Sequence, residues 1–243
     1  MKILVTGISG RMGQAVKQAV ELNPETDLGS THDVGQDVVA AMQQADCAID
    51  FSFHGFTPEL LDTAVAQGKP LVIGTTGHTD EERAAIKAAA TRIPIVFASN
   101  YSVGVNTLFW LTRKATQILK DYDIEIVEMH HHHKLDAPSG TARTLAEVVC
   151  EETGMDYDKD VMHGREGLVG ARPQRQIGMH SMRGGDVVGD HTVIYATDGE
   201  RVELTHKASS RMTFAGGAVR AALWLADKPA GLYNMQDVLG FAD

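Results

Sequence analysis

The chain has 243 residues, of which 43% are hydrophobic and 22% are charged, as in globular domains that bury a sizeable core. Its formal net charge of −10 argues against nucleic acid as a partner. The two cysteines, Cys47 and Cys150, are too distant in sequence to indicate a disulfide framework, so we expect a reducing, cytoplasmic environment. No apolar run is long enough to cross a membrane, and the chain opens on a strand pattern, so we expect neither a membrane span nor a signal peptide.

The first residues predict a strand, a glycine-rich turn and a helix. Ile3 to Val5 is apolar, the turn has the spacing G-x-x-G-x-x-G, and a helical pattern runs from Gly13 to just before Pro24. This is the context of a dinucleotide-binding turn, in which glycines let the backbone approach a pyrophosphate and the helix N-terminus carries its charge. A plain glycine turn is the alternative. The predicted cofactor-binding residues of this turn are Gly7, Ile8, Ser9, Gly10, Arg11 and Met12.

An acidic residue follows the second predicted strand, residues 27–31. Asp33 lies about 20 positions past the glycines, where a carboxylate can accept hydrogen bonds from the adenosine ribose. A 2′-phosphate facing Asp33 would be repelled, although Arg11 could offset part of this repulsion. We therefore expect both cofactors to bind, with NADH preferred over NADPH.

Strands and helices continue to alternate up to about residue 102. Further strands are predicted at 46–52, 70–74 and 93–98, and helices at 57–66, with Thr57 as N-cap, and at 79–90. This alternation predicts an α/β fold with a doubly wound, Rossmann-like parallel sheet, whose ligands bind beyond the carboxyl ends of the strands. Two segments at such ends are predicted to hold the nicotinamide: Gly74, Thr75 and Thr76, and Ala98, Ser99, Asn100 and Tyr101.

The second half of the chain changes character. A long amphipathic helix is expected at 103–120, a surface loop at 163–176 and a helix from about Phe214, and three alternating segments predict an antiparallel or mixed sheet. The predicted domains are thus a dinucleotide-binding domain, and a C-terminal α+β domain for substrate binding and oligomerisation. The dinucleotide-binding domain comprises residues 1–102 and about 214–243, and the C-terminal domain comprises residues 103–213. The three strands lie at 177–183, 189–196 and 201–207.

A dense polar cluster, EIVEMHHHHKLDAPSGTA, occupies residues 125–142 between a strand pattern and a helical pattern. Pro138 and Ser139 are typical of a helix start, whose free N–H groups suit a carboxylate. Histidines and Lys134 add proton donors and a fixed cation, so the cluster predicts a pocket that binds a small anion and gives it a proton. A fragment of a purification tag, a structural polar loop and a metal site are alternatives. Strand alternation would put His130 and His132 on one face and the other two histidines on the opposite face, which argues against a shared metal ion.

This cluster resembles the signature of the dihydrodipicolinate reductase family, the nicotinamide-dependent enzymes of bacterial lysine and diaminopimelate synthesis. The matching residues are Glu125, Ile126, Glu128, His130, Lys134, Asp136, Pro138, Ser139, Gly140, Thr141 and Ala142. The resemblance extends over essentially the whole chain. It implies hydride transfer from NAD(P)H to 4-hydroxy-tetrahydrodipicolinate, a small dicarboxylate, and a homotetramer formed through the C-terminal sheet. It further implies that His130 and Lys134 are catalytic, that His131, Gly140 and Thr141 bind substrate, and that no metal takes part.

Parts of the sequence also agree with two functions other than reduction of 4-hydroxy-tetrahydrodipicolinate. An extended short-chain dehydrogenase would share the glycine spacing but needs a lysine four residues after a tyrosine. No tyrosine in the chain has a lysine at that spacing, so the sequence argues against a short-chain dehydrogenase. The five tyrosines are Tyr101, Tyr122, Tyr157, Tyr195 and Tyr233. A cofactor-binding sensor without catalysis, whose histidines would tune a response to pH, stays as the alternative.

Overall fold

The computed structural model describes residues 1–241, and the chain forms two compact units. The first unit consists of residues 1–103 together with the chain from Arg211 onward, and the second of Gly104–Ser210. Each unit has its own sheet, with a hydrophobic core on both faces of the sheet in the first unit and on one face in the second. Within the described range, no helix is long and apolar enough to cross a membrane.

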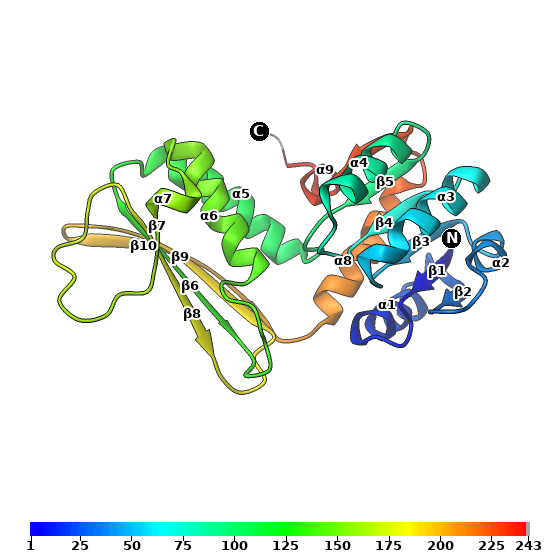
Figure 1. Cartoon of the computed structure of the whole chain (residues 1–243), viewed down its shortest axis with the longest axis horizontal. Helices are drawn as coiled ribbons and strands as arrows, with labels where there is room; N and C mark the ends of the chain where they lie inside the picture. The colour runs from blue at the N-terminus through cyan, green and yellow to red at the C-terminus, as the bar shows by residue number, and fades with distance from the viewer. Residues whose placement is uncertain (242–243) are drawn as a thin grey trace. The chain divides into compact units, whose positions relative to one another are not determined.

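The first unit is built on a parallel sheet with the strand order β11-β5-β4-β3-β1-β2 (Figure 1). All neighbouring strands pair in parallel, so the predicted doubly wound fold is confirmed. The chain goes from β1 to β2 on one side and then crosses to β3 on the other, which makes the ends of β1 and β3 the switch point where such sheets bind ligands. The strands are β1 (Lys2–Thr6), β2 (Asp27–His32), β3 (Cys47–Asp50), β4 (Leu71–Ile73), β5 (Pro94–Phe97) and β11 (Gly231–Tyr233).

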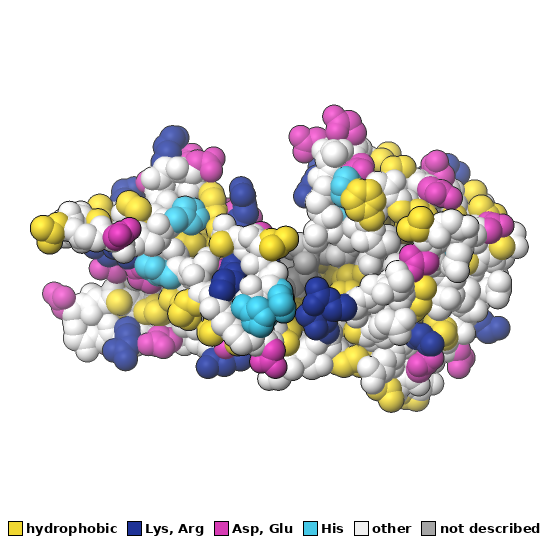
Figure 2. All heavy atoms as spheres, turned by 60° about the horizontal axis from the view of Figure 1, so that its bottom comes forward, with side chains coloured by type: hydrophobic (Ala, Val, Ile, Leu, Met, Phe, Trp, Pro, Cys, Tyr) yellow, Lys and Arg dark blue, Asp and Glu magenta, His cyan; other side chains and the backbone are white. Residues whose placement is uncertain are grey.

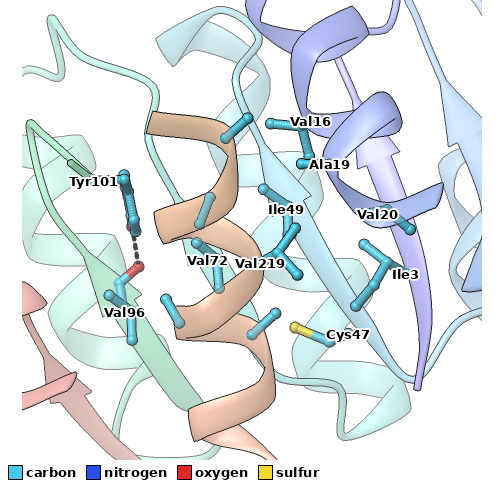
Figure 3. Close-up of a cluster of buried hydrophobic side chains, with 14 of the residues drawn as sticks. Ile3, Val16, Ala19, Val20, Cys47, Ile49, Val72, Val96, Tyr101 and Val219 are labelled. Carbon is cyan, nitrogen blue, oxygen red and sulfur yellow. Dashed lines mark hydrogen bonds between the residues drawn. The ribbon is translucent and has the colours of Figure 1, made fainter. Parts of the chain in front are cut away.

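Helices cover both faces of this sheet. Successive strand side chains point to opposite faces, so Ile3 and Val5 join one core (Figure 3) and Leu4 joins the other. In the first core, Tyr101 donates its hydroxyl to the carbonyl of Val96 (3.0 Å). The helices on the side of Ile3 are α1 (Arg11–Leu22), α8 (Met212–Leu225) and α9 (Met235–Leu239), and those on the side of Leu4 are α2 (Val38–Gln43), α3 (Thr57–Gln67) and α4 (Asp80–Ala89).

Two predicted helix starts were wrong. A short 3-10 helix, η1 (His54–Phe56), leads directly into α3, so Thr57 is already helical and does not cap it; its hydroxyl instead bonds to Nε2 of His78 at 2.8 Å. Helix α1 begins at Arg11 rather than at Gly13, with Gly10 as its N-cap. Thr79, by contrast, caps α4 in a capping box with Glu82. Thr57 thus lost its capping role because η1 abuts the start of α3.

The second unit is built on a mixed sheet with the order β10-β9-β6-β8-β7. Strand β9 runs antiparallel to both neighbours, and β6, β8 and β7 run parallel to one another. Helices α5 and α6 lie on one side of the sheet (Figure 1) and pack against the alternate residues that point to them. The elements are α5 (Val103–Ile118), β6 (Asp123–His130), α6 (Gly140–Thr153), α7 (Tyr157–Asp160), β7 (Val161–His163), β8 (Ile177–Arg183), β9 (Gly189–Thr197) and β10 (Glu200–Ala208).

The segment from 164 to 176 is mostly exposed, as predicted for a surface loop, but ion pairs attach it to the sheet. Arg165 and Arg172 both contact the carboxylate of Glu125 on β6, at 2.8 and 3.0 Å, and Arg172 also reaches Asp123 at 2.7 Å. Burial by itself would raise the pKa of Glu125, but hydrogen bonds from Arg165, His180 and Arg172 lower it to about 2. Glu125 is therefore ionised at neutral pH and holds this loop by charge.

Two adjacent glycines of α8 give a matched test of the packing in the first unit. A Cβ at Gly217 would lie 1.8 Å from the carbonyl oxygen of Tyr101, whereas a Cβ at Gly216 would meet nothing within 4 Å. We expect Gly217→Ala to lower the free energy of unfolding by roughly 1–3 kcal/mol through overpacking. Gly216→Ala should raise it by up to about 1 kcal/mol because alanine favours the helix. Urea unfolding of both variants measures this, and equal effects would show that α8 does not approach the 101 backbone this closely.

Candidate active site

The polar site of the second unit begins as a continuation of the core pattern of β6. Ile124 and Ile126 point into the hydrophobic core, and every second residue of a strand shares a face. Glu128 and His130 therefore point to the same side as the core, at the last positions of the strand. A carboxylate and an imidazole on a core-facing row need polar partners, and neighbouring elements supply them.

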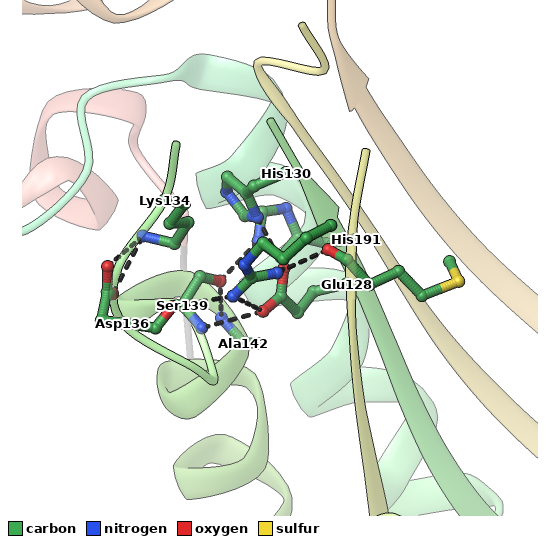
Figure 4. Close-up of polar contacts among 9 residues, drawn as sticks. Glu128, His130, Lys134, Asp136, Ser139, Ala142 and His191 are labelled. Carbon is green, nitrogen blue, oxygen red and sulfur yellow. Dashed lines mark hydrogen bonds and ion pairs between the residues drawn. The ribbon is translucent and has the colours of Figure 1, made fainter. Parts of the chain in front are cut away.

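Glu128 is the central residue of this site (Figure 4). Its side chain is 0% exposed and accepts two hydrogen bonds from Arg183 of β8, at 2.9 and 2.8 Å. It also accepts the backbone N–H of Ser139 at 3.2 Å and a hydrogen bond from Nδ1 of His130 at 2.6 Å. Burial would raise the pKa of Glu128, but the bonds from His130 and Arg183 lower it to about 2. The carboxylate is thus ionised and can only accept, which puts a proton on Nδ1 of His130.

A second histidine lies beside His130 but has a different character. His191 of β9 is paired across the sheet with Glu128, its Nε2 is 3.0 Å from the hydroxyl of Ser139, and its ring is edge-on to His130 at a centroid distance of 5.2 Å. Burial, followed by the nearby charge of His130, lowers the pKa of His191 to about 3. His191 is therefore neutral at physiological pH and cannot act as an acid there.

The remaining histidines of the cluster leave the strand. The backbone N–H groups of His131 and His132 donate to the carbonyls of Val187 (2.7 Å) and Gly185 (3.3 Å), and β6 ends at His130. The expected strand alternation of four histidines was wrong beyond this point. His132 and His133 are exposed, and Figure 2 shows histidine side chains grouped at the surface.

Lys134 is held by a neighbour in this turn. Its ammonium donates to both carboxylate oxygens of Asp136, at 2.8 and 2.9 Å, and the lysine side chain is 18% exposed against 64% for the aspartate. Burial would raise the pKa of Asp136, but the bond from Lys134 lowers it. Lys134 was expected as a fixed cation, but its pairing with Asp136 was not predicted from the sequence.

The turn leads into the N-terminus of α6. Ser139 is the N-cap, its hydroxyl accepting the N–H of Ala142 at 3.2 Å, and Gly140 and Thr141 are the first two helical residues. The first N–H groups of a helix have no intrahelical acceptor and favour an anion. Arg183 connects this turn to Glu128, because its Nη2 also donates to the carbonyl of Asp136 at 2.7 Å. The structure thus brings His130 and the start of α6 into contact with a single buried carboxylate, and Lys134 lies in the turn that connects them.

The predicted dinucleotide turn lies at the switch point of the first unit. Gly7 has φ 66°, and a Cβ there would lie 2.4 Å from the carbonyl oxygen of Phe51. Helix α1 comes so close to this turn that a Cβ at Gly13 would lie 2.1 Å from the carbonyl oxygen of Gly7. Only glycines allow this packing, and it directs the N-terminus of α1 beyond the carboxyl end of β1. The turn fits a pyrophosphate.

Asp33 is joined to the same turn. Its carboxylate accepts the N–H of Ser9 at 2.7 Å and that of Val34 at 2.9 Å. Hydrogen bonding from the Ser9 side chain, and then from these two N–H groups, lowers the pKa of Asp33. The carboxylate is therefore charged at neutral pH and lies next to the glycine turn. Both features fit a ribose-binding acid.

The two predicted nicotinamide segments differ in how their side chains are used. Thr75 is buried and donates to Asp50 at 2.6 Å, whereas Thr76 is exposed. Tyr101 is buried as a whole residue, and its side chain lies inside the core. Ala98 and Asn100 are half-buried and Ser99 is exposed. Asp50 itself, which also accepts the hydroxyls of Thr6 and Ser52 at 2.5 Å each, was not expected from the sequence, although a buried aspartate at a strand end is a visible signal.

No group of three His, Cys, Asp or Glu side chains among residues 1–241 could hold a metal ion. The polar residues of the second unit that sequence reasoning left without a role are Glu128, Arg183 and His191. Strand alternation could have found them, because each falls on the core-facing row of its strand.

Known proteins resemble this chain along its entire length. Two family models match, "Dihydrodipicolinate reductase, N-terminus" over residues 1–101 and "Dihydrodipicolinate reductase, C-terminus" over residues 104–239. The chain is 68% identical to a 4-hydroxy-tetrahydrodipicolinate reductase of Akkermansia muciniphila, over 100% of this chain and 99% of the relative. It is 47% identical to the enzyme of the same name from Magnetococcus marinus, with 99% of each chain covered.

The fold has solved counterparts as well. A dipicolinate-bound dihydrodipicolinate reductase from Paenisporosarcina sp. TG-14 superposes with a TM-score of 0.78 over 98% of each chain at 23% identity, a likeness that concerns the fold alone. The sequence identities of 68% and 47% over nearly the whole chain, by contrast, show the family as well as the fold. The chain belongs to the dihydrodipicolinate reductase family.

Proposed function

We propose that this chain reduces 4-hydroxy-tetrahydrodipicolinate to tetrahydrodipicolinate with hydride from NADH or NADPH, a step of lysine and diaminopimelate synthesis. The relatives that are 68% and 47% identical carry the name of this reductase. The solved relative is described as dipicolinate-bound, and dipicolinate is a pyridine dicarboxylate. The observation that carries the proposal is the His130–Glu128 pair, which lies beside Lys134 and the N-terminus of α6.

We assign the cofactor to the first unit. The bound cofactor supplies the hydride. The glycine turn and the N-terminus of α1 would hold the pyrophosphate, Asp33 the adenosine ribose, and the ends of β4 and β5 the nicotinamide. The residues of this proposed site are Gly7, Ile8, Ser9, Gly10, Arg11, Met12, Asp33, Gly74, Thr75, Thr76, Ala98, Ser99, Asn100 and Tyr101.

We assign the substrate and the proton to the second unit. His130 donates the proton that completes the reduction. The ammonium of Lys134 and the N–H groups of Gly140 and Thr141 neutralise the carboxylates, and His131 borders the substrate. Because Lys134 already binds Asp136, a substrate carboxylate would have to take the place of that side chain or share the ammonium with it.

We extend the proposal to a cytoplasmic homotetramer. Helices α5 and α6 cover the sheet of the second unit on one side. The opposite side carries half-buried residues such as Val127 and Ile194 and exposed ones such as Met182. A sheet of this kind gains stability when a further copy of the chain covers it.

Oxidation of the reduced cofactor tests the proposed reaction. We expect absorbance at the reduced nicotinamide band to fall when enzymatically generated substrate is added; a non-catalytic sensor would bind the cofactor and leave it reduced.

His130→Gln should lower turnover on the order of 10²–10⁴-fold, because it removes a positioned acid. The dissociation constant of NADH should not change. An equal loss of cofactor binding would mean that His130 supports the structure rather than the chemistry.

The cofactor preference depends on Asp33. We expect the wild-type enzyme to bind NADH more tightly than NADPH by at most about tenfold, because the charged carboxylate opposes a 2′-phosphate while Arg11 attracts it. Asp33→Asn should narrow the difference, measured by fluorescence titration of both reduced cofactors. Asp27→Asn, at the other end of β2, is the matched control. Tighter binding of NADPH by the wild type would contradict the assignment.

Lys134 should be required for recognition of the dicarboxylate. Truncation to alanine removes a partly desolvated cation, and we expect a loss of roughly 2–5 kcal/mol in transition-state stabilisation. It should be visible both in steady-state kinetics and in the dissociation constant of pyridine-2,6-dicarboxylate. Lys159→Ala is the control, since that exposed lysine also pairs with an aspartate but lies on α7. Unchanged binding of the dicarboxylate to Lys134→Ala would remove Lys134 from the site.

A further inference from the structure

The proposed reaction leaves the most highly connected group of the site without a role. Glu128 is 0% exposed, is ionised, and receives hydrogen bonds from His130, from Ser139 and twice from Arg183. Taking a carboxylate and a guanidinium out of water carries a large desolvation penalty, and an apolar pair of similar volume is often as stable. Stability alone is thus a weak reason for this pair, and its contact with His130 suggests a part in catalysis.

The hydrogen bond between Glu128 and His130 settles which ring nitrogen is available. An ionised carboxylate only accepts, so Nδ1 of His130 carries a proton that is committed to Glu128. The second proton of the imidazolium is then on Nε2. The backbone beside Nε2 belongs to Gly189 of β9, where a Cβ would lie 2.9 Å from that nitrogen. A side chain at position 189 would crowd the atom that has to deliver the proton.

The charged and titratable groups around His130 come from several elements. Glu128 is on its own strand, Arg183 comes from β8, and His191 comes from β9 and is neutral. Lys134 follows in the turn and is paired with Asp136. Because Arg183 offsets the charge of Glu128, the net charge next to His130 is small, and the main effect of Glu128 is the direction of one hydrogen bond.

We propose that Glu128, clamped by Arg183, is a positioning residue that holds His130 with its Nε2–H as the proton to be transferred. This inference rests on the proposed function of His130 as the proton donor. In the step itself the Nε2–H bond breaks, its electron pair stays on Nε2, and the proton forms a new bond to the substrate carbon. His130 is left neutral, with Nδ1–H still donated to Glu128, and solvent returns a proton to Nε2. The hydride comes separately, from the reduced nicotinamide, and bonds to the carbon from which the 4-hydroxyl has left as water, so that hydride, proton and water account for the conversion to tetrahydrodipicolinate.

A double-mutant cycle between Glu128 and His130 tests this inference. Glu128→Gln should lower kcat on the order of 10–10²-fold, a part of the 10²–10⁴-fold that a positioned acid contributes. The dissociation constant of NADH should stay the same, since the change lies in the second unit. In a His130→Gln background the same substitution should change kcat by less than about twofold, because there is no imidazole left to position.

Glu125→Gln is a matched control from the same strand. Glu125 is also an ionised glutamate bonded to arginines and to a histidine, His180, but none of these groups contacts His130 in the described contacts. The Glu125→Gln variant should leave kcat unchanged. If Glu128→Gln does not fold because Arg183 is left unpaired, the pair Glu128→Gln with Arg183→Gln removes both charges and takes its place in the cycle.

The possible outcomes separate the two proposals. If His130→Gln alone leaves kcat unchanged, the proposed role of His130 fails and this inference fails with it. If His130→Gln is impaired but Glu128→Gln lowers kcat equally in both backgrounds, Glu128 supports the fold and only the present inference is overturned. A loss confined to the background that contains His130 supports the positioning role.

Discussion

The ion pair between Glu128 and Arg183 is the interaction on which the arrangement of the proposed active site depends. Through it, the end of β6, the end of β8 and the turn before α6 share one buried carboxylate. Without this ion pair, each of these segments would end in solvent, where its backbone and side chains could adopt many conformations. A buried charge allows few arrangements, because any that leaves it unpaired is penalised by several kcal/mol. His130 and the N-terminus of α6 are therefore fixed relative to each other.

In the first unit, too, a buried carboxylate joins several segments, but its hydrogen-bond donors are neutral hydroxyl groups. Asp50 is buried at the end of β3 and accepts the hydroxyls of Thr6, Ser52 and Thr75, which come from the ends of β1, β3 and β4. These are the strand ends next to the switch point, where a parallel sheet has room for a ligand. In both units, then, loops that would otherwise move independently are joined by one carboxylate at the carboxyl ends of strands.

Charge poses a specific difficulty for this enzyme, because a protein with a net charge of −10 has to bind a dicarboxylate. Figure 2 shows acidic side chains spread over the visible face rather than gathered, so the attraction has to be local. In the proposed site, Lys134 and the N-terminus of α6 would supply this attraction from one short segment of chain. The pairing of Lys134 with Asp136 satisfies the ammonium before substrate arrives, and a partner whose carboxylates also reach the helix N–H groups can compete with it.

Local sequence determined most of the regular elements of this protein and the identity of its signature, because periodicity and capping act over a few residues: every strand of the described residues except β7 and β11, the helix that follows Thr79 and the turn at Gly7 were predicted. Tertiary structure decided the rest. Thr57 lost its capping role because η1 runs into α3, and β11 formed because its three residues pair with β5. The partners of His130 also required the fold, since Glu128 meets Arg183 and His191 only when strands distant in sequence pair. Sequence spacing cannot specify which side chains face each other across a sheet until the register is known.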